Sequence, residues 1–240
     1  MSISEILSAI SHRPWPIPSG KWVYYQEWNQ TIFLHWEVKY DALRKLVAPE
    51  MELDSFEGKY YISVVPFSMQ YIRPRSLPAV GFISNFHEIN VRTYVLKDNK
   101  PGVLFLNIEA EKWISTFIAK QLSGLPYEKA SINRNKGNYN SNNLNKGFYL
   151  HIDFEIKNQL TSKSDLDKWL TERYCLYLKK DNRLFRYEIH HQEWELNEIS
   201  IDNLKLNYKL GEVHLNESLP YIAHYSKGVQ VLAWEREVIF

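Results

Sequence analysis

The chain of 240 residues contains one cysteine, Cys175, which excludes an internal disulfide and any paired-cysteine metal or redox motif. No apolar run approaches the ~18 residues that a membrane-spanning helix needs. The first seven residues carry an acid and no basic segment, unlike a secretory signal. Lys and Arg number 29 against 28 Asp and Glu, so there is no basic excess for nucleic acid. These absences predict a cytoplasmic protein with neither a nucleic-acid nor a membrane partner.

No internal repeat and no Pro-, Gly- or Ser-rich linker divides the chain, so residues 1–240 are predicted to form one domain. The one biased segment is Asn133–Lys146, with 7 Asn in 14 residues. Asn tolerates the left-handed backbone conformation and bonds its own backbone. We therefore expect a long loop or hairpin tip at about 133–146, more simply a flexible polar tip than a binding loop.

Strand patterns dominate the rest of the chain. They cover Trp22–Trp28, Thr31–Val38, Tyr60–Phe67, His87–Leu96, Val103–Ala110, Phe148–Ile156, Tyr174–Leu178, Leu184–Trp194 and Val229–Trp234. Helices are expected over Ala42–Val47 with Asp41 as its cap, over Glu111–Leu122, and after the capping-box pair Ser164 and Asp167. Many short strands and few helices predict a mainly β fold, a curved antiparallel sheet or barrel with minor α and helices packed outside.

The strand over His87–Leu96 carries the most informative polar residues. Side chains alternate faces along a strand, so Glu88, Asn90 and Arg92 share one face. Glu is a proton acceptor, Asn is both donor and acceptor, and Arg can bind a carboxylate through two hydrogen bonds. If this face lines a cavity, it is a site for a small carboxylate. If it faces water, it is an ordinary polar strand face with a salt bridge.

No metal centre is expected. His151, Asp153 and Glu155 share a strand face, but residues two apart on a strand lie ~7 Å from each other and converge poorly on one ion. His190 and His191 are adjacent, so on a strand they point to opposite faces. No nucleotide-binding or catalytic signature motif is present, and we expect no cofactor.

Several stretches together resemble a known family. They are His12-Arg-Pro-Trp-Pro, Phe33-Leu-His-Trp, Asp41-Ala-Leu-Arg-Lys-Leu-Val-Ala-Pro-Glu-Met-Glu-Leu-Asp, Val64-Val-Pro-Phe, Glu88-Ile-Asn-Val-Arg-Thr-Tyr-Val, Gly124-Leu-Pro-Tyr and Leu170-Thr-Glu-Arg-Tyr. The chain resembles the bacterial YqjF-like family of unknown function, which is placed in the acetoacetate decarboxylase-like superfamily. The resemblance covers nearly the whole chain and implies one cone-shaped antiparallel β-barrel with an interior pocket and a few peripheral helices.

The superfamily's chemistry carries over only in part. Acetoacetate decarboxylase forms a Schiff base from a lysine that follows a proline, beside a second lysine. At the matching positions this chain has Tyr127 and Glu128. Lys129, two residues after Tyr127, is on the same strand face and is the remaining Schiff-base candidate, although the neighbouring acid would raise its pKa, which is the wrong direction for a nucleophile. Glu88 resembles in position the acid that lines the decarboxylase pocket.

The first functional hypothesis is a barrel that binds a small carboxylate or oxo acid and that, if it is an enzyme, acts as a lyase or isomerase without the usual Schiff base. Arg92 would hold the carboxylate, Glu88 would move a proton, and Asn90 and Tyr127 would orient the ligand. Arg73 and Arg75, on a proline-stiffened loop, could stand at the pocket mouth, although a solvated loop is the simpler interpretation.

The alternative is a non-enzymatic binding or sensing barrel for an apolar or aromatic ligand, lined by some of the 8 Trp and 16 Tyr. A structural or interaction protein is the third reading. A homo-oligomer remains open in all three.

Overall fold

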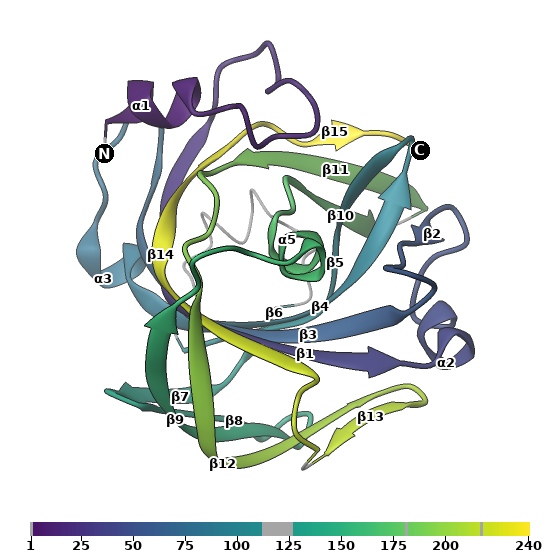
Figure 1. Ribbon diagram of the computed structural model, residues 1–240. Coiled ribbons are helices and arrows are strands. Elements are labelled where there is room, and N and C mark those ends of the chain that lie inside the picture. Colours follow the sequence, from purple (N-terminus) through teal and green to yellow (C-terminus); the bar gives the residue numbers. More distant parts are fainter. Residues whose placement is uncertain (1, 112–126, 181, 217) are drawn as a thin grey trace.

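A computed structural model describes residues 2–111, 127–180, 182–216 and 218–240 (Figure 1). The helices are α1 (Ile3–Ser8), α2 (Tyr40–Arg44), α3 (Gly81–Ser84) and α5 (Asp165–Thr171). The strands are β1 (Tyr24–Val38), β2 (Glu52–Leu53), β3 (Tyr60–Pro74), β4 (Phe86–Lys97), β5 (Lys100–Ala110), β6 (Tyr127–Lys129), β7 (Ser131–Asn135), β8 (Asn138–Asn143), β9 (Phe148–Gln159), β10 (Cys175–Lys180), β11 (Arg183–His190), β12 (Asn197–Leu210), β13 (Val213–Asn216), β14 (Ile222–Ala233) and β15 (Glu237–Val238).

The central feature is a closed ring of strands. In order around the ring, β14, β1, β3, β4 and β5 are neighbours, then β10 and β11, and β11 pairs back onto β14 (Figure 1). Most of the pairings in the ring are long and antiparallel. Two are short: β5–β10, which is parallel, and β11–β14, which is antiparallel, each join only two residue pairs. The ring therefore has two short seams, which flank β10 and β11.

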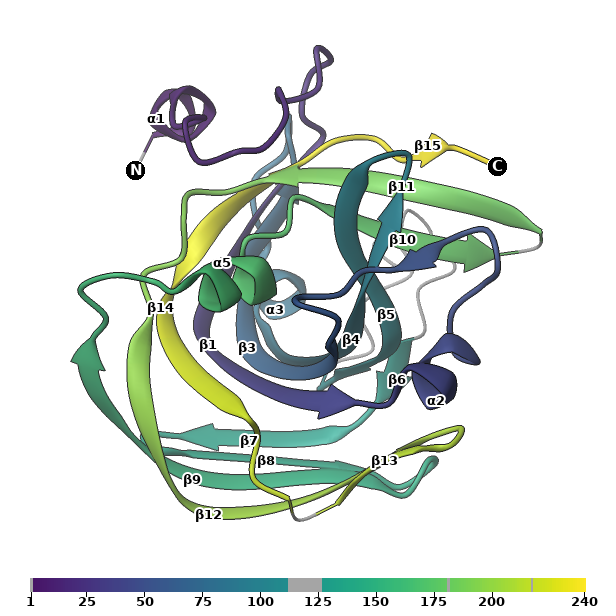
Figure 2. The same cartoon turned by 45° about the vertical axis from the view of Figure 1, so that its right-hand side comes forward.

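A second layer of strands packs against one side of this ring. It contains β7, β8, β9, β12 and β13, and in Figure 2 it lies below β1 and β3. The largest hydrophobic core fills the space between the two layers and includes Ile89 and Val91 of β4 with Leu150 and Ile152 of β9. Apolar side chains at every second position of both strands make this core, as period-2 alternation requires.

Helix α5 lies within the outline of the ring in Figure 1. Its N-cap is Ser164, whose side chain accepts a hydrogen bond from the backbone N–H of Asp167. The Asp167 carboxylate in turn accepts from the backbone N–H of Ser164, which completes the predicted capping box. Leu170 is fully buried and packs with Tyr61 and Tyr94. The apolar side chains of α5 therefore face ring strands, as expected of a helix that packs against the sheet.

The mainly β fold and nearly all of the predicted strands are confirmed. Two predictions are wrong. The segment Asn133–Lys146 is a hairpin, but most of its Asn residues lie in the strands β7 and β8 rather than in a loop, and several of their amides bond other side chains, as Asn138 does with Asp153. Helix α2 begins after Lys39 and has no side-chain cap, so Asp41 lies inside its first turn. The helix predicted over Glu111–Leu122 lies outside the described residues from position 112 onward.

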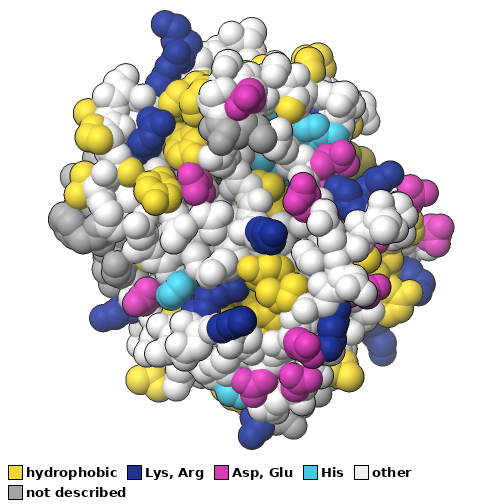
Figure 3. Space-filling model, turned by 60° about the vertical axis from the view of Figure 1, so that its left-hand side comes forward, with side chains coloured by type: hydrophobic (Ala, Val, Ile, Leu, Met, Phe, Trp, Pro, Cys, Tyr) yellow, Lys and Arg dark blue, Asp and Glu magenta, His cyan; other side chains and the backbone are white. Residues whose placement is uncertain are grey.

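On the face that Figure 3 shows, charged side chains of both signs are interspersed with hydrophobic ones. This mixture fits the near-zero net charge of the chain. No helix within the described residues is both long and apolar enough to cross a membrane.

The seam between β5 and β10 depends on a glycine. A Cβ added at Gly102 would lie 2.6 Å from the backbone oxygen of Cys175 and 2.7 Å from its sulfur, so Gly102→Ala forces the two strands apart. We expect a loss of roughly 1–3 kcal/mol in unfolding free energy, measured by denaturant titration. Gly20→Ala is the matched control, since nothing lies within 4 Å of its added Cβ. Equal stability of the two variants would contradict this description of the seam.

Candidate functional site

The polar face of β4 points into the ring. Glu88, Asn90 and Arg92 are 3 %, 8 % and 8 % exposed, while the intervening Ile89 and Val91 pack into the core between the layers. Closing the sheet into a ring turns one strand face toward the centre, so the polar face avoids both water and the main core. Strand alternation alone left open whether the face of Glu88, Asn90 and Arg92 lines a cavity or faces water. In the structure this face is buried.

A small enclosed cavity lies inside the ring, bordered by β1, β3, β4, β5 and the segments around β10 and β11. It is lined by Trp28, Thr31, Phe33, Val65, Phe67, Asn90, Arg92, Val103, Phe105, Thr171, Arg173, Leu176, Ile189, His191 and Trp194. We call it the interior cavity. It leaves about 30 Å³ for the centres of water-sized groups, which is room for two or three such groups.

Arg92 enters this cavity without a counter-ion. Its Nη2 donates to the backbone oxygen of Leu170 at 3.4 Å, and its guanidinium carbon lies 5.9 Å from the centre of the Phe33 ring. Its Nε is buried and has no hydrogen-bond partner, and no acid among the described residues forms an ion pair with it. A buried cation with an unpaired hydrogen-bond donor lowers the stability of the fold unless an anion pairs with it and accepts that hydrogen bond.

A second arginine lines the same cavity. Arg173, which follows α5, is 5 % exposed; its Nη1 pairs with Asp54 at 2.5 Å, and its Nε donates to the Trp169 backbone oxygen at 2.7 Å. Its Nη2 is buried and has no partner. Burial lowers the pKa of Arg173, Asp54 raises it, and the nearby Arg92 lowers it further, so the two guanidinium groups are electrostatically coupled.

Glu88 is a buried acid. Burial raises its pKa from 4.5 to about 8, and hydrogen bonding with the side chains of Asn90 and Tyr127 only partly opposes this rise. Burial and the nearby Glu88 likewise raise the pKa of Tyr127 well above its usual value. The Oε2 atom of Glu88 is buried without a partner among the described residues. Near neutral pH Glu88 is therefore largely protonated and can donate a proton.

Two histidines border this region and remain neutral. His35 is fully buried, its Nδ1 bonds the Ser63 hydroxyl at 2.6 Å, and its Nε2 has no partner. Burial lowers the pKa of His35 well below its usual value, and Arg92 lowers it further. His191 lines the cavity, and burial lowers its pKa too.

Of the other predicted site residues, only Tyr127 lies beside Glu88. Tyr127 on β6 is partly buried beside Glu88, whereas Lys129, two residues further, is exposed. The structure thus does not bring Lys129 to the buried acid. Glu128, between them, pairs with Lys146 at 3.1 Å.

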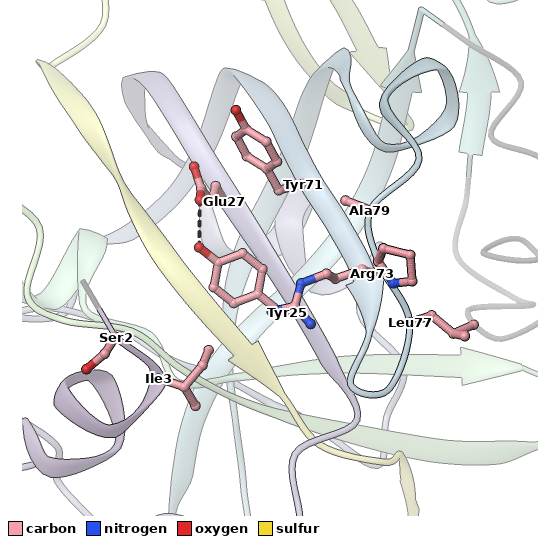
Figure 4. A pocket seen from close by; sticks show the side chains of 9 residues that line it. Ser2, Ile3, Tyr25, Glu27, Tyr71, Arg73, Leu77 and Ala79 are labelled. Atoms are coloured by element: carbon pink, nitrogen blue, oxygen red, sulfur yellow. Dashed lines mark hydrogen bonds between the residues drawn. The ribbon is translucent and has the colours of Figure 1, made fainter.

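Arg73 lines an outer groove rather than the interior cavity. Figure 4 shows it beside Tyr25, whose hydroxyl donates to Glu27 at 2.6 Å, with Leu77 and Ala79 nearby. The Arg73 guanidinium carbon lies 4.8 Å from the centre of the Tyr25 ring. Arg73 lies in β3 and is not among the residues that line the interior cavity, so the structure does not bring it together with Arg92.

Among the described residues, no three His, Cys, Asp or Glu side chains are grouped to hold a metal ion. His151 and Asp153 do contact each other at 3.0 Å, but both are about one-third exposed on the outer layer and are bonded by Asn140 and Asn203. A further buried acid, Glu109, lies between the layers, where it accepts from Ser141 at 3.0 Å.

Sequence reasoning did not single out Arg173, His35 or His191 as site residues. Arg173 and His35 do lie in stretches that carry the family resemblance, Leu170-Thr-Glu-Arg-Tyr and Phe33-Leu-His-Trp. Strand alternation could not connect them with Arg92, since they come from other elements.

The ring of strands with its polar interior defines an acetoacetate decarboxylase-like fold. The enduracididine biosynthesis enzyme MppR, in a complex with pyruvate, superposes with a TM-score of 0.62 over 95% of this chain and 93% of that chain at 9% identity. Acetoacetate decarboxylase from Legionella pneumophila gives 0.60 over 98% and 96% at 12% identity, and an acetoacetate decarboxylase-like enzyme from Sphingomonas wittichii RW1 gives 0.59 over 92% and 94% at 11% identity.

The family follows from sequence similarity. Residues 25–230 match the model of DUF2071, described as an uncharacterised conserved protein. The uncharacterised protein YqjF of Bacillus subtilis (strain 168) is 36% identical over 229 residues, which cover 91% of this chain and 93% of that protein. The chain therefore belongs to the DUF2071 family, as the resemblance predicted.

The buried acid predicts a pH-dependent stability. Because the pKa of Glu88 rises from 4.5 to about 8 on folding, its stabilising contribution is complete below about pH 4.5 and is lost as the pH rises to about 8. We expect Glu88→Gln to gain stability relative to the wild type across this window, by at most about 5 kcal/mol. Denaturant titrations at several pH values measure the difference. Burial also raises the pKa of Glu109, but this residue contributes equally to the stability of both proteins, so its contribution cancels in the difference. A constant difference between them would show that Glu88 is ionised throughout.

Proposed function

We propose that this protein binds a small carboxylate or oxo acid in the interior cavity, with Arg92 as the residue that holds the carboxylate. The observation that carries the proposal is a buried guanidinium without an acid partner among the described residues, beside a small cavity. A carboxylate would supply the missing charge and accept from the unused Nε–H, with charge-assisted hydrogen bonds. MppR, a similar fold, is described in complex with pyruvate, which supports this class of ligand by analogy.

The size of the cavity favours a carboxylate over a large apolar ligand. About 30 Å³ for water-sized centres fits the two oxygens of a carboxylate, and the remaining atoms of a small oxo acid need smaller shifts of the lining side chains than an aromatic ligand, which would have to displace Phe33, Trp28 or Trp194. Those rings pack on each other, with 5.0 Å between the centres of Phe33 and Trp194. The aromatic side chains thus form walls around the polar groups, which is the usual composition of small-molecule sites.

A catalytic role would rest on Glu88. A protonated carboxyl group on the same strand face as Arg92, four residues away, can deliver a proton at the Glu88 end of this face while Arg92 holds a carboxylate at the other end. Asn90 lies between them on that face and supplies a polar group that bonds Glu88. This pairing of a neutral acid with a fixed cation suits lyase or isomerase chemistry on an oxo acid.

The binding role predicts a specific loss in Arg92→Met. We expect pyruvate to raise the melting temperature of the wild type and to leave that of Arg92→Met unchanged, with affinity at least tenfold lower by calorimetry. Without ligand, the variant should be as stable as the wild type or more so, because a buried uncompensated charge is removed.

Arg44→Met is the matched control. Arg44 donates to the backbone oxygens of Val47, Ala48 and Met51, so its loss should lower stability while leaving the pyruvate response intact. Equal pyruvate responses in the wild type and Arg92→Met would contradict the proposal.

The absence of the lysine pair predicts that no Schiff base forms. After incubation with pyruvate and borohydride, intact-mass spectrometry should find the unmodified chain. A stable increase in mass that maps to Lys129 would instead establish imine chemistry at that exposed side chain.

A further inference from the structure

We infer that Arg173 and Asp54 make the interior cavity selective for ligands that carry a single negative charge. The inference rests on the proposed carboxylate site and adds a second anchoring residue and a charge rule. It concerns residues that the sequence did not mark as functional.

Arg173 is built to be rigid. Its guanidinium carbon lies 4.2 Å from the centre of the Trp169 ring and 4.9 Å from that of Tyr94, and its Nε donates to the backbone of Trp169. Asp54 holds Nη1 on one side. The remaining Nη2 is buried without a partner in a residue that lines the interior cavity, so this arginine has one donor available to a ligand.

Two residues that line the cavity carry such donors, on different elements. Nε of Arg92 comes from β4, and Nη2 of Arg173 comes from the segment after α5; both are unpartnered and buried. The two arginines interact electrostatically, which requires that they lie near each other. A carboxylate that bridges the two donors would receive one hydrogen bond on each oxygen, a geometry that neither arginine offers alone.

The charge balance then sets the ligand's charge. Arg92 and Arg173 are the cations that line the cavity, and Asp54 is the one carboxylate in ion-pair contact with either among the described residues. One positive charge is left over. A monoanion neutralises it, while a dianion of similar size would leave a negative charge in a desolvated space. The cavity is also lined by Trp28, Phe33 and Trp194, which suit an apolar tail better than a second carboxylate.

Asp54→Asn tests the charge rule. Pyruvate and oxalate are similar in size, but pyruvate carries one charge and oxalate two. By calorimetry at neutral pH, we expect the wild type to bind pyruvate at least tenfold more tightly than oxalate. In Asp54→Asn, which leaves two cations uncompensated, oxalate should gain at least tenfold relative to pyruvate. Glu50→Gln is the control, because Glu50 pairs with Lys179 away from the cavity, and its ratio should equal that of the wild type.

Arg173→Lys provides a second, milder variant if Asp54→Asn does not fold. It keeps the charge beside Asp54 but loses the planar group that presents Nη2, so pyruvate should bind at least tenfold more weakly while remaining preferred over oxalate.

The outcomes separate the two proposals. If neither anion binds the wild type, the carboxylate function itself is overturned. If pyruvate binds and its preference over oxalate is the same in Asp54→Asn, or its affinity is the same in Arg173→Lys, the carboxylate site stands and the role of Arg173 and Asp54 is overturned.

Discussion

The organising constraint in this molecule is the closure of a β-sheet into a ring. An open sheet can leave one face in water, but a ring must bury one face of every strand. On β4 the face turned inward carries Glu88, Asn90 and Arg92. The fold therefore buries an acid, an amide and a cation in an interior that excludes water. Their protonation and hydrogen bonding follow from this burial. The two short seams beside β10 and β11 bring Arg173 and His191 to the same space.

Burial affects Glu88 and Arg92, the two buried charged residues of β4, differently. Glu88 responds by keeping its proton, since its pKa rises to about 8. Arg92 cannot become neutral in the same manner, because a guanidinium group stays protonated in proteins. The outcome is a neutral acid and an uncompensated cation four residues apart on one strand face. Such an arrangement is expensive for folding alone, and it is the kind of strain that proteins keep where a ligand is bound.

The sequence predicted the class of fold and the shared face of Glu88, Asn90 and Arg92, because strand alternation is a local property. It also predicted the cap at Ser164, which depends on residues three apart. It could not say whether the polar face turns inward, since that depends on pairing between β11 and β14, far apart in the chain. For the same reason it missed Arg173, and it did not anticipate that Arg73 lines a separate outer groove. The Asn-rich segment was misassigned because amide groups that favour turns also bond one another along a strand, as Asn140 does with Asn138 in β8.

The most direct test is a crystal structure of the protein with pyruvate. The carboxylate should lie inside the ring, with one oxygen within hydrogen-bonding distance of Nε of Arg92 and the other within reach of Nη2 of Arg173. Pyruvate bound only in the outer groove beside Arg73, or an interior closed by side chains at saturating pyruvate, would contradict a carboxylate site in the ring.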